Sequence, residues 1–285
     1  MKFFKIGIIS DCLGLPFASG VEMCANLGAD GVQIYAVEGE MSPENLSASD
    51  IMEKRNVLSA NGLSVSALCG DLGGHGFARP EENSYKIEKS KRIVDLALAL
   101  GTNVVTTHIG VIPEDQKSEA YMVMQEACNK LSEYAHANGA YFAVETGPEP
   151  AVRLKLFLDS LDSRGVAVNL DPANLVMVTG DDPVSAVYTL KDYIVHTHAK
   201  DGRMITLSDP AKIYGFFAEG GIGDLRLEEY FLELPLGRGN VDFDAYLAAL
   251  HDIGYEGYLT IEREVGKNPA EDIAEAVTFL KKKLF

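Results

Sequence analysis

Apolar positions in this chain follow one arrangement that recurs along its length. A segment with helical periodicity ends at a glycine, and a short apolar run rich in β-branched residues follows, as at Gly101 before 103–109 and at Gly139 before 140–145. Glycine is favoured just after a helix, where the chain turns through the left-handed conformation. A short apolar run after such a stop is typical of a parallel strand covered on both faces. The pattern therefore predicts alternating strands and helices.

Eight runs of this kind occur, and helical segments alternate with them. We predict strands near residues 5–9, 31–35, 63–69, 103–109, 140–145, 166–170, 193–198 and 257–262. We predict helices near residues 17–28, 44–61, 81–100, 115–138, 150–163, 183–191, 243–253 and 270–283. Eight alternating pairs favour an α/β fold of the closed (β/α)8 TIM-barrel type over an open doubly wound sheet. The lack of a glycine-rich nucleotide-binding motif after any predicted strand also weighs against the open sheet.

One segment departs from this alternation. Between His198 and Val241 lie about 40 residues, where a connection of roughly 2–6 residues is usual. We expect residues 1–285 to form a single TIM-barrel domain, with the long loop 199–241 at the mouth of the barrel. Such a loop would act as a lid or as a contact in a homo-oligomer.

The composition narrows the class of protein. An apolar content of 47% and a charged content of 24% are ordinary for a soluble globular domain. The net charge of −17, from 42 acidic and 25 basic residues, repels phosphate backbones and so disfavours nucleic-acid binding. No run approaches the roughly 20 apolar residues of a membrane span, and the apolar run at the N-terminus is too short for a signal peptide. Four scattered cysteines without CxxC spacing favour reduced thiols and a cytoplasmic location.

Four of the predicted strands end on side chains that bind metals, namely Glu145, Asp171, His198 and Glu262. The carboxyl ends of the strands of a TIM barrel converge on one face, where active sites lie. For any one of these residues, a helix cap or a surface salt bridge is an equally good explanation. Three carboxylates in one pocket, however, need protons or a cation to compensate their charge. We therefore predict one divalent metal ion, with Mn²⁺ or Mg²⁺ favoured by the oxygen-rich donor set and Zn²⁺ or Co²⁺ as alternatives.

Several motifs also give the chain a resemblance to a known family. The motifs are Thr107-His108-Ile109-Gly110, Val144-Glu145-Thr146-Gly147, Asn169-Leu170-Asp171-Pro172-Ala173-Asn174, His196-Thr197-His198-Ala199-Lys200-Asp201, Leu234-Pro235-Leu236-Gly237-Arg238-Gly239 and Gly257-Tyr258-Leu259-Thr260-Ile261-Glu262. In these motifs the chain resembles the xylose-isomerase-like TIM barrels, specifically the sugar (phosphate) isomerase and epimerase group. That group includes ketose 3-epimerases, hydroxypyruvate isomerases, inosose isomerases and inosose dehydratases. The resemblance implies the same four metal ligands. In the family's Asp-x-x-His pattern, however, Asn174 stands in place of the histidine, and the loss of this possible second-metal ligand argues for a single metal.

The resemblance implies a metal-dependent isomerase or epimerase of a sugar or short ketose. A divalent ion would chelate a carbonyl oxygen and the neighbouring hydroxyl of the substrate and stabilise an enediolate. Glu145 and Glu262 are then the expected acid and base, on opposite sides of the metal. The alternative on the same site is a metal-dependent polyol dehydratase, similar to inosose dehydratase.

Further residues are weaker candidates for contact with a sugar or polyol substrate. They are His108, Glu149, Asn174, Lys200 and Arg203. His108 is equally explained as a histidine of the barrel mouth, Glu149 as a charge at a helix N-terminus and Lys200 as a solvated lysine. His196 shares the inward parity of His198, and we expect it in the core below the site. His75 lies in a glycine-rich loop that could close over the substrate.

Two other classes of protein share this barrel. An endonuclease-IV-like repair enzyme would need a site for several zinc ions, with more histidines, and a basic face for DNA. The six histidines and the net charge of −17 of this chain disfavour that class. A sugar-binding protein without catalysis is disfavoured by the complete set of four ligands.

Overall fold

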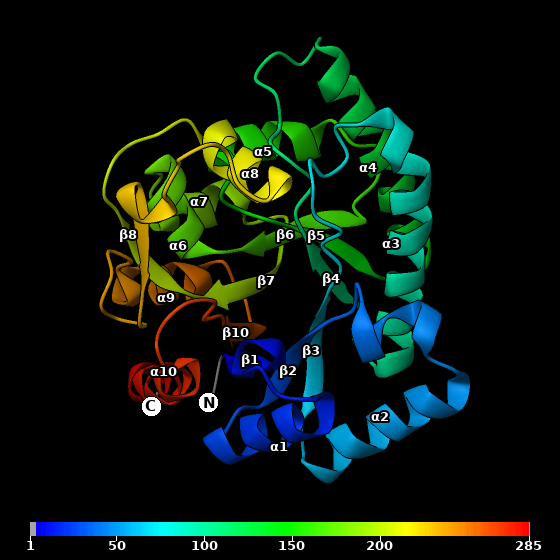
Figure 1. Ribbon diagram of the computed structural model, residues 1–285, viewed down its shortest axis with the longest axis vertical. Helices are drawn as coiled ribbons and strands as arrows, with labels where there is room; N and C mark the ends of the chain where they lie inside the picture. The colour runs from blue at the N-terminus through cyan, green and yellow to red at the C-terminus, as the bar shows by residue number, and fades with distance from the viewer. Residues whose placement is uncertain (1–3, 285) are drawn as a thin grey trace.

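Eight parallel strands close into a barrel in the computed structural model, which describes residues 4–284 (Figure 1). The strands are β1 (Lys5–Ile9), β2 (Gly31–Tyr35), β3 (Ser64–Cys69), β4 (Val104–Thr107), β5 (Tyr141–Glu145), β6 (Val166–Leu170), β7 (Ile194–Ala199) and β10 (Tyr258–Ile261). Around the barrel their order is β1-β10-β7-β6-β5-β4-β3-β2. This closed parallel order confirms the predicted (β/α)8 TIM barrel.

Helices connect successive strands on the outside of the barrel (Figure 1). The helices are α1 (Phe17–Leu27), α2 (Ala48–Ala60), α3 (Pro80–Leu100), α4 (Glu119–Ala137), α5 (Ala151–Asp159), α7 (Pro183–Leu190), α9 (Phe243–Asp252) and α10 (Pro269–Leu284). Helices α2 and α4 begin about four residues later than predicted, because Ser47 and Ser118 cap them. The Ser47 side chain accepts a hydrogen bond from the backbone N–H of Asp50, and Ser118 accepts one from Tyr121. None of the helices of residues 4–284 is long and apolar enough to cross a membrane.

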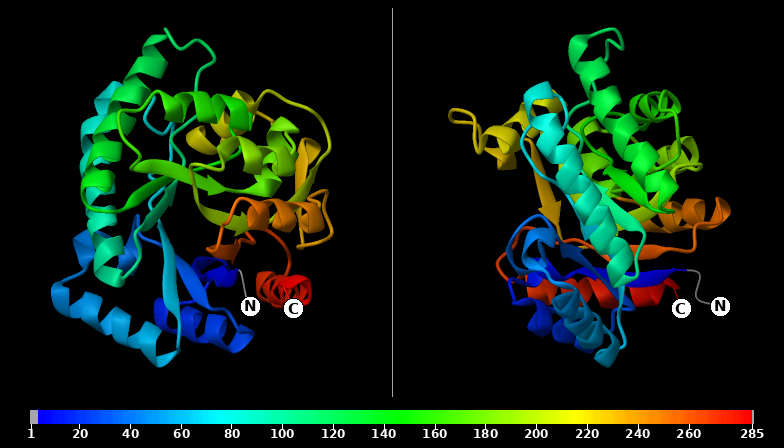
Figure 2. Two further views of the ribbon diagram at one scale, coloured as in Figure 1. Left: turned by 180° about the vertical axis from the view of Figure 1, so that it is seen from behind. Right: turned by 90° about the vertical axis from the view of Figure 1, so that its right-hand side faces the viewer.

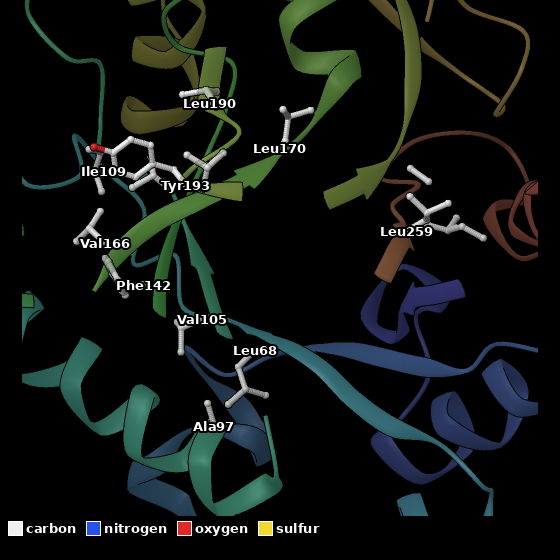
Figure 3. Packing of buried hydrophobic residues seen from close by; sticks show 14 of the residues in the cluster. Leu68, Ala97, Val105, Ile109, Phe142, Val166, Leu170, Leu190, Tyr193 and Leu259 are labelled. Carbon is white, nitrogen blue, oxygen red and sulfur yellow. The ribbon is translucent and has the colours of Figure 1, made fainter. Parts of the chain in front are cut away.

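The alternation of side chains along the strands separates the core from the site. On β5, Phe142 and Val144 are buried in the main apolar cluster, part of which is shown in Figure 3. Ala143 belongs instead to a small separate cluster with Ala67 and Val104. Since successive residues of a strand point to opposite sides, Ala143 and Glu145 share the other face, which is the barrel interior. Small residues deep in the barrel and a carboxylate at its mouth leave room for a polar site there.

The segment that follows β7 holds regular structure where we predicted a loop. It contains β8 (Asp201–Met204) and β9 (Phe231–Leu234), which pair antiparallel, and α8 (Pro210–Glu219) between them. Asp201 is buried and anchors the end of the segment, since its carboxylate accepts hydrogen bonds from Gly237 N at 3.0 Å and Gly239 N at 2.8 Å. The segment stands out from the barrel wall in the right-hand view of Figure 2, where it is yellow.

Candidate metal centre

The four predicted ligands meet at the mouth of the barrel. Glu145 ends β5, Asp171 follows β6, His198 lies in β7 and Glu262 follows β10. One ligand atom from each of these buried residues lies within 4.8 Å of the others. His198 Nδ1 lies at the centre, 3.2 Å from Glu262 Oε2, 3.4 Å from Asp171 Oδ2 and 3.6 Å from Glu145 Oε2. Four residues up to 117 positions apart in sequence thus share one point, because parallel strands bring their carboxyl ends to the same edge.

The unsatisfied atoms of this cluster suit a cation. Asp171 Oδ2 and Glu262 Oε2 are buried and make no hydrogen bond of good geometry within residues 4–284, although Lys200 Nζ lies 3.0 Å from Glu262 Oε2 as an ion-pair partner. Burial by itself lowers the pKa of His198, but the carboxylates of Glu262 and Glu145 outweigh it and hold the pKa well above its ordinary value. The pocket therefore attracts positive charge. Three carboxylate oxygens and one imidazole nitrogen form a donor set that fits Mn²⁺ or Mg²⁺.

Two asparagines orient the ligands. Asn174 Nδ2 donates to Glu145 Oε1 at 2.8 Å, and Asn169 Nδ2 donates to Glu145 Oε2 at 3.1 Å. The backbone N–H of Asn174 also donates to Asp171 Oδ1 at 2.9 Å, which leaves Oδ2 facing the cluster. Asn174 lines the cavity as predicted for a substrate contact, yet its amide is engaged with Glu145. Partners of this kind fix the rotamer of a metal ligand.

Gln33 on β2 orients the histidine, and sequence reasoning missed it. Gln33 Oε1 lies 3.2 Å from His198 Nε2 and 3.0 Å from His196 Nε2. An amide oxygen at Nε2 favours a proton on this nitrogen, so in the neutral, metal-binding form of His198 the lone pair of Nδ1 would face the cluster. His196 is buried beneath the site, as predicted, and burial together with His198 holds its pKa well below the ordinary value. The available signal was a glutamine within an otherwise apolar strand.

Lys200 is the positive neighbour of the cluster. Its Nζ lies 3.0 Å from Glu262 Oε2 and 2.6 Å from Glu264 Oε2, and the side chain is buried on the wall of the cavity. Burial raises the pKa of Glu262, but Lys200 and His198 outweigh it and lower the pKa below its ordinary value. Burial by itself lowers the pKa of Lys200, but Glu262 and Glu264 outweigh it and hold the pKa well above its ordinary value. Glu262 is therefore held as a carboxylate.

His108 lines the cavity on the other side of Glu145. Its Nδ1 lies 3.2 Å from Asp71 Oδ2, a residue that sequence reasoning missed, and its Nε2 lies 3.9 Å from Glu145 Oε1. Burial lowers the pKa of His108, but Glu145 and Asp71 outweigh it and raise the pKa to about 9. His108 Nε2 is buried without a hydrogen bond among the described residues. The imidazolium thus has a donor available to a molecule in the cavity.

Two other predicted substrate contacts do not reach the cavity. Glu149 is only 1% exposed and accepts a hydrogen bond from Ile112 N at 3.2 Å, within the loop after His108. Burial raises the pKa of Glu149 to about 7. Arg203 lies on β8 with an exposed side chain and is absent from the cavity wall. Neither side chain lines the cavity, because Glu149 turns into the core and Arg203 points into solvent.

A cavity of about 560 Å³ lies above the four ligands. The segment after β7 forms one wall through Ile213, Tyr214 and Phe217 of α8 and through Phe231 of β9. The glycine-rich loop after β3 forms another wall, and its His75 pairs through Nε2 with Glu219 at the end of α8. The two segments therefore meet across the mouth of the barrel.

A model of one known family matches this chain over residues 21–283, and its description is "Xylose isomerase-like TIM barrel". The chain belongs to this family. Among solved structures, the crystal structure of a xylose isomerase domain protein from Planctomyces limnophilus is similar to it. The TM-score is 0.79, the sequence identity is 26%, and the match covers 98% of this chain and 96% of that protein.

Curated relatives are similar to this chain at low identity. An inosose isomerase from Bacillus velezensis is 24% identical over 255 residues, which cover 85% of this chain and 81% of that protein. An inosose dehydratase from Clostridium perfringens is 25% identical over 172 residues, which cover 58% of this chain and 55% of that protein. The chain thus spans about half the length of the dehydratases that it matches, between 43% and 55%. These relatives are isomerases and lyases, so the family alone leaves the reaction class open.

Proposed function

We propose that this protein is a divalent-metal-dependent isomerase or epimerase of a sugar or short ketose. The observation that carries the proposal is the cluster of Glu145, Asp171, His198 and Glu262, whose ligand atoms lie within 4.8 Å of one another at the base of a 560 Å³ cavity. The inosose isomerases among the relatives, whose matches cover 85% and 86% of this chain, support the same reaction class.

The proposed chemistry divides between the metal and two glutamates. When bound, the metal would polarise the carbonyl of a ketose and so acidify the proton on the neighbouring carbon. Glu145 and Glu262 enter the cavity from β5 and after β10, with β6 and β7 between these strands in the barrel. They can therefore approach one carbon from two directions. One carboxylate removes the proton, and the other, in its protonated form, returns a proton to the opposite face or to the adjacent carbon.

The neighbours of the two glutamates fit these roles. Lys200 and His198 keep Glu262 ionised, which suits a base. Asn169 and Asn174 hold both oxygens of Glu145 in place by hydrogen bonds at 3.1 Å and 2.8 Å. In a reversible reaction each glutamate serves as the base in one direction.

We also propose that α8 and its flanking residues act as the lid predicted for 199–241. Ile213, Tyr214 and Phe217 cover the cavity from this segment, and Glu219 joins it to His75 across the mouth. A closed lid would exclude water from the site and so protect a carbanion-like intermediate from exchange with solvent.

The second candidate is a metal-dependent polyol dehydratase. The observation that favours it is His108, which has a pKa of about 9 and a buried Nε2 without a hydrogen bond, on the wall of the cavity. An imidazolium placed there can protonate a departing hydroxyl. An inosose dehydratase is also among the relatives.

The experiment incubates the Mn²⁺-loaded protein with a panel of ketoses and inososes in D2O. Deuterium in an unchanged carbon skeleton supports the isomerase or epimerase, and loss of water supports the dehydratase. We expect Glu145→Gln and Glu262→Gln to lower kcat by about 10²–10⁴, and a chelator to abolish turnover until Mn²⁺ is restored. Glu53→Gln, at an exposed position of α2, is the matched control and should retain activity. Activity of either site variant within a few-fold of wild type would refute the assigned roles.

A further inference from the structure

The cavity is larger than a single sugar needs. Pockets of about 300–1,000 Å³ hold drug-sized ligands, which exceed a monosaccharide considerably, and this cavity measures about 560 Å³. Three of the four ligands, Glu145, His198 and Glu262, line it together with Lys200, whereas Tyr214, Phe217 and Phe231 lie in the wall that the segment after β7 contributes. A sugar that reached the metal would leave the space beside these aromatic residues unfilled.

A row of rings leads from the reaction centre to the mouth. His108 lies beside Glu145, and its ring centre is 5.6 Å from that of Tyr214. The ring of Tyr214 is in turn 6.4 Å from that of Phe217. Phe217 is 56% exposed although it lines the cavity, so a large part of its ring is free to bind a ligand. Apolar ring faces of this kind suit the C–H face of a second ring.

Polar backbone lies near the same aromatic residues. The loop with Gly73, Gly74 and Gly76 lines the cavity without side chains at these positions, and the pairing of His75 with Glu219 places this loop against the end of α8. A sugar ring has C–H faces and hydroxyl edges. The glycines leave the backbone of this loop uncovered by side chains, although Lys86 Nζ already donates to Gly73 O at 3.1 Å and to Gly76 O at 2.7 Å. A mouth that combines an exposed aromatic ring with polar backbone fits a sugar ring better than it fits a purely apolar group.

The charges of the wall disfavour an anion. Lys200 is the only lysine or arginine among the described residues that line the cavity, and it is already paired with Glu262 and Glu264. His108 is paired with Asp71, and His75 with Glu219. The lining carboxylates are Asp71, Glu145, Glu233, Glu262 and Glu264. The cationic donor that stays free, His108 Nε2, lies 3.9 Å from Glu145 Oε1, at the reaction centre. A phosphate or carboxylate beside the aromatic residues would find no unpaired lysine or arginine among the described lining residues and would be repelled by these carboxylates.

We propose that the substrate is an uncharged glycoside, with its ketose unit at the four-ligand site and its second sugar ring against Phe217 and Tyr214. This inference rests on the proposed function and adds the substrate class to it. Phe217 is then a residue that determines specificity, because it contacts the part of the substrate that does not react.

The test compares D-fructose with fructose derivatives that carry a phosphate or a second sugar ring. Calorimetric titration of the Mn²⁺-loaded protein measures the affinity for D-fructose, for fructose 6-phosphate and for isomaltulose, which carries a glucosyl group at O6. Turanose and lactulose place the second ring at other oxygens. We expect at least one of the three disaccharides to bind about tenfold more tightly than D-fructose, as one stacked ring would give. We expect fructose 6-phosphate to bind more weakly than D-fructose.

Two variants locate the second ring. Phe217→Ala should lower the affinity for the preferred disaccharide by about tenfold and the affinity for D-fructose much less. Leu207→Ala is the matched control, since Leu207 is 72% exposed on the same segment and does not line the cavity. It should leave both affinities unchanged.

The outcomes separate this inference from the proposed function. Tighter binding of the phosphate than of D-fructose, or no gain from any disaccharide while D-fructose binds and is turned over, overturns the glycoside alone. Failure of the Mn²⁺-loaded protein to bind or convert every ketose in the series, free or substituted, overturns the proposed function and the glycoside with it.

Discussion

Glu149 carries a buried charge whose cost should appear in the pH dependence of stability. The side chain is 1% exposed, and burial raises its pKa from 4.5 to about 7. Between these two values the folded protein retains a proton that the unfolded chain releases. The free energy of unfolding therefore falls as the pH rises through this window and stays constant above it. At about 1.4 kcal/mol for each pH unit, the loss from this one group reaches about 3 kcal/mol.

Glu149→Gln removes the ionisation and keeps an oxygen that can accept from the N–H of Ile112. We expect the variant to match the wild type near pH 4.5 and to exceed its free energy of unfolding by about 2–3 kcal/mol at pH 8. Urea unfolding followed by circular dichroism, at several pH values and at one fixed metal concentration, measures the difference. Glu53→Gln, exposed on α2, controls for the loss of one negative charge.

A difference between Glu149→Gln and the wild type that stays constant from pH 4.5 to pH 8 would refute the reasoning. A variant with unchanged stability at every pH but a raised KM would instead support the substrate contact predicted from the sequence.

Three further changes test other parts of the site. Lys200→Met leaves Glu262 buried without its lysine partner. We expect the free energy of unfolding of the metal-free protein, measured in urea, to fall by about 3–5 kcal/mol. An unchanged free energy of unfolding would contradict the ion pair. Gly147→Ala strains a backbone with φ +143° and places a methyl group against Tyr214 Oη and Asn174. The kcat/KM for a converted ketose should therefore fall at least tenfold. Wild-type kinetics would show that this contact is dispensable. Arg203→Gln should leave KM within twofold, because the side chain is exposed outside the cavity, and a large rise in KM would return it to the site.

The barrel and the meeting of its four strand ends were accessible from the sequence. A helix that stops at a glycine and a strand that follows it are local signals, and eight repeats of the pair permit few closed arrangements. In a parallel barrel, the position of a residue along its strand also sets its height. Glu145, Asp171, His198 and Glu262 all lie at strand ends, so the sequence alone predicted that they converge.

Side chains outside the strand ends followed no such rule. Glu149 and Lys200 both lie in segments after strands, yet Glu149 turns into the core beside Ile112 while Lys200 lines the cavity. Gln33 of β2 orients His198, and Asp71 of the loop after β3 orients His108, both from positions distant in sequence. Helix α8 brings Tyr214 to the site from a segment that the sequence showed only as a long connection after β7. Periodicity records which elements exist and which residues share a face. The direction of a loop side chain depends instead on the atoms that pack around it, and these come from parts of the chain that only folding brings together.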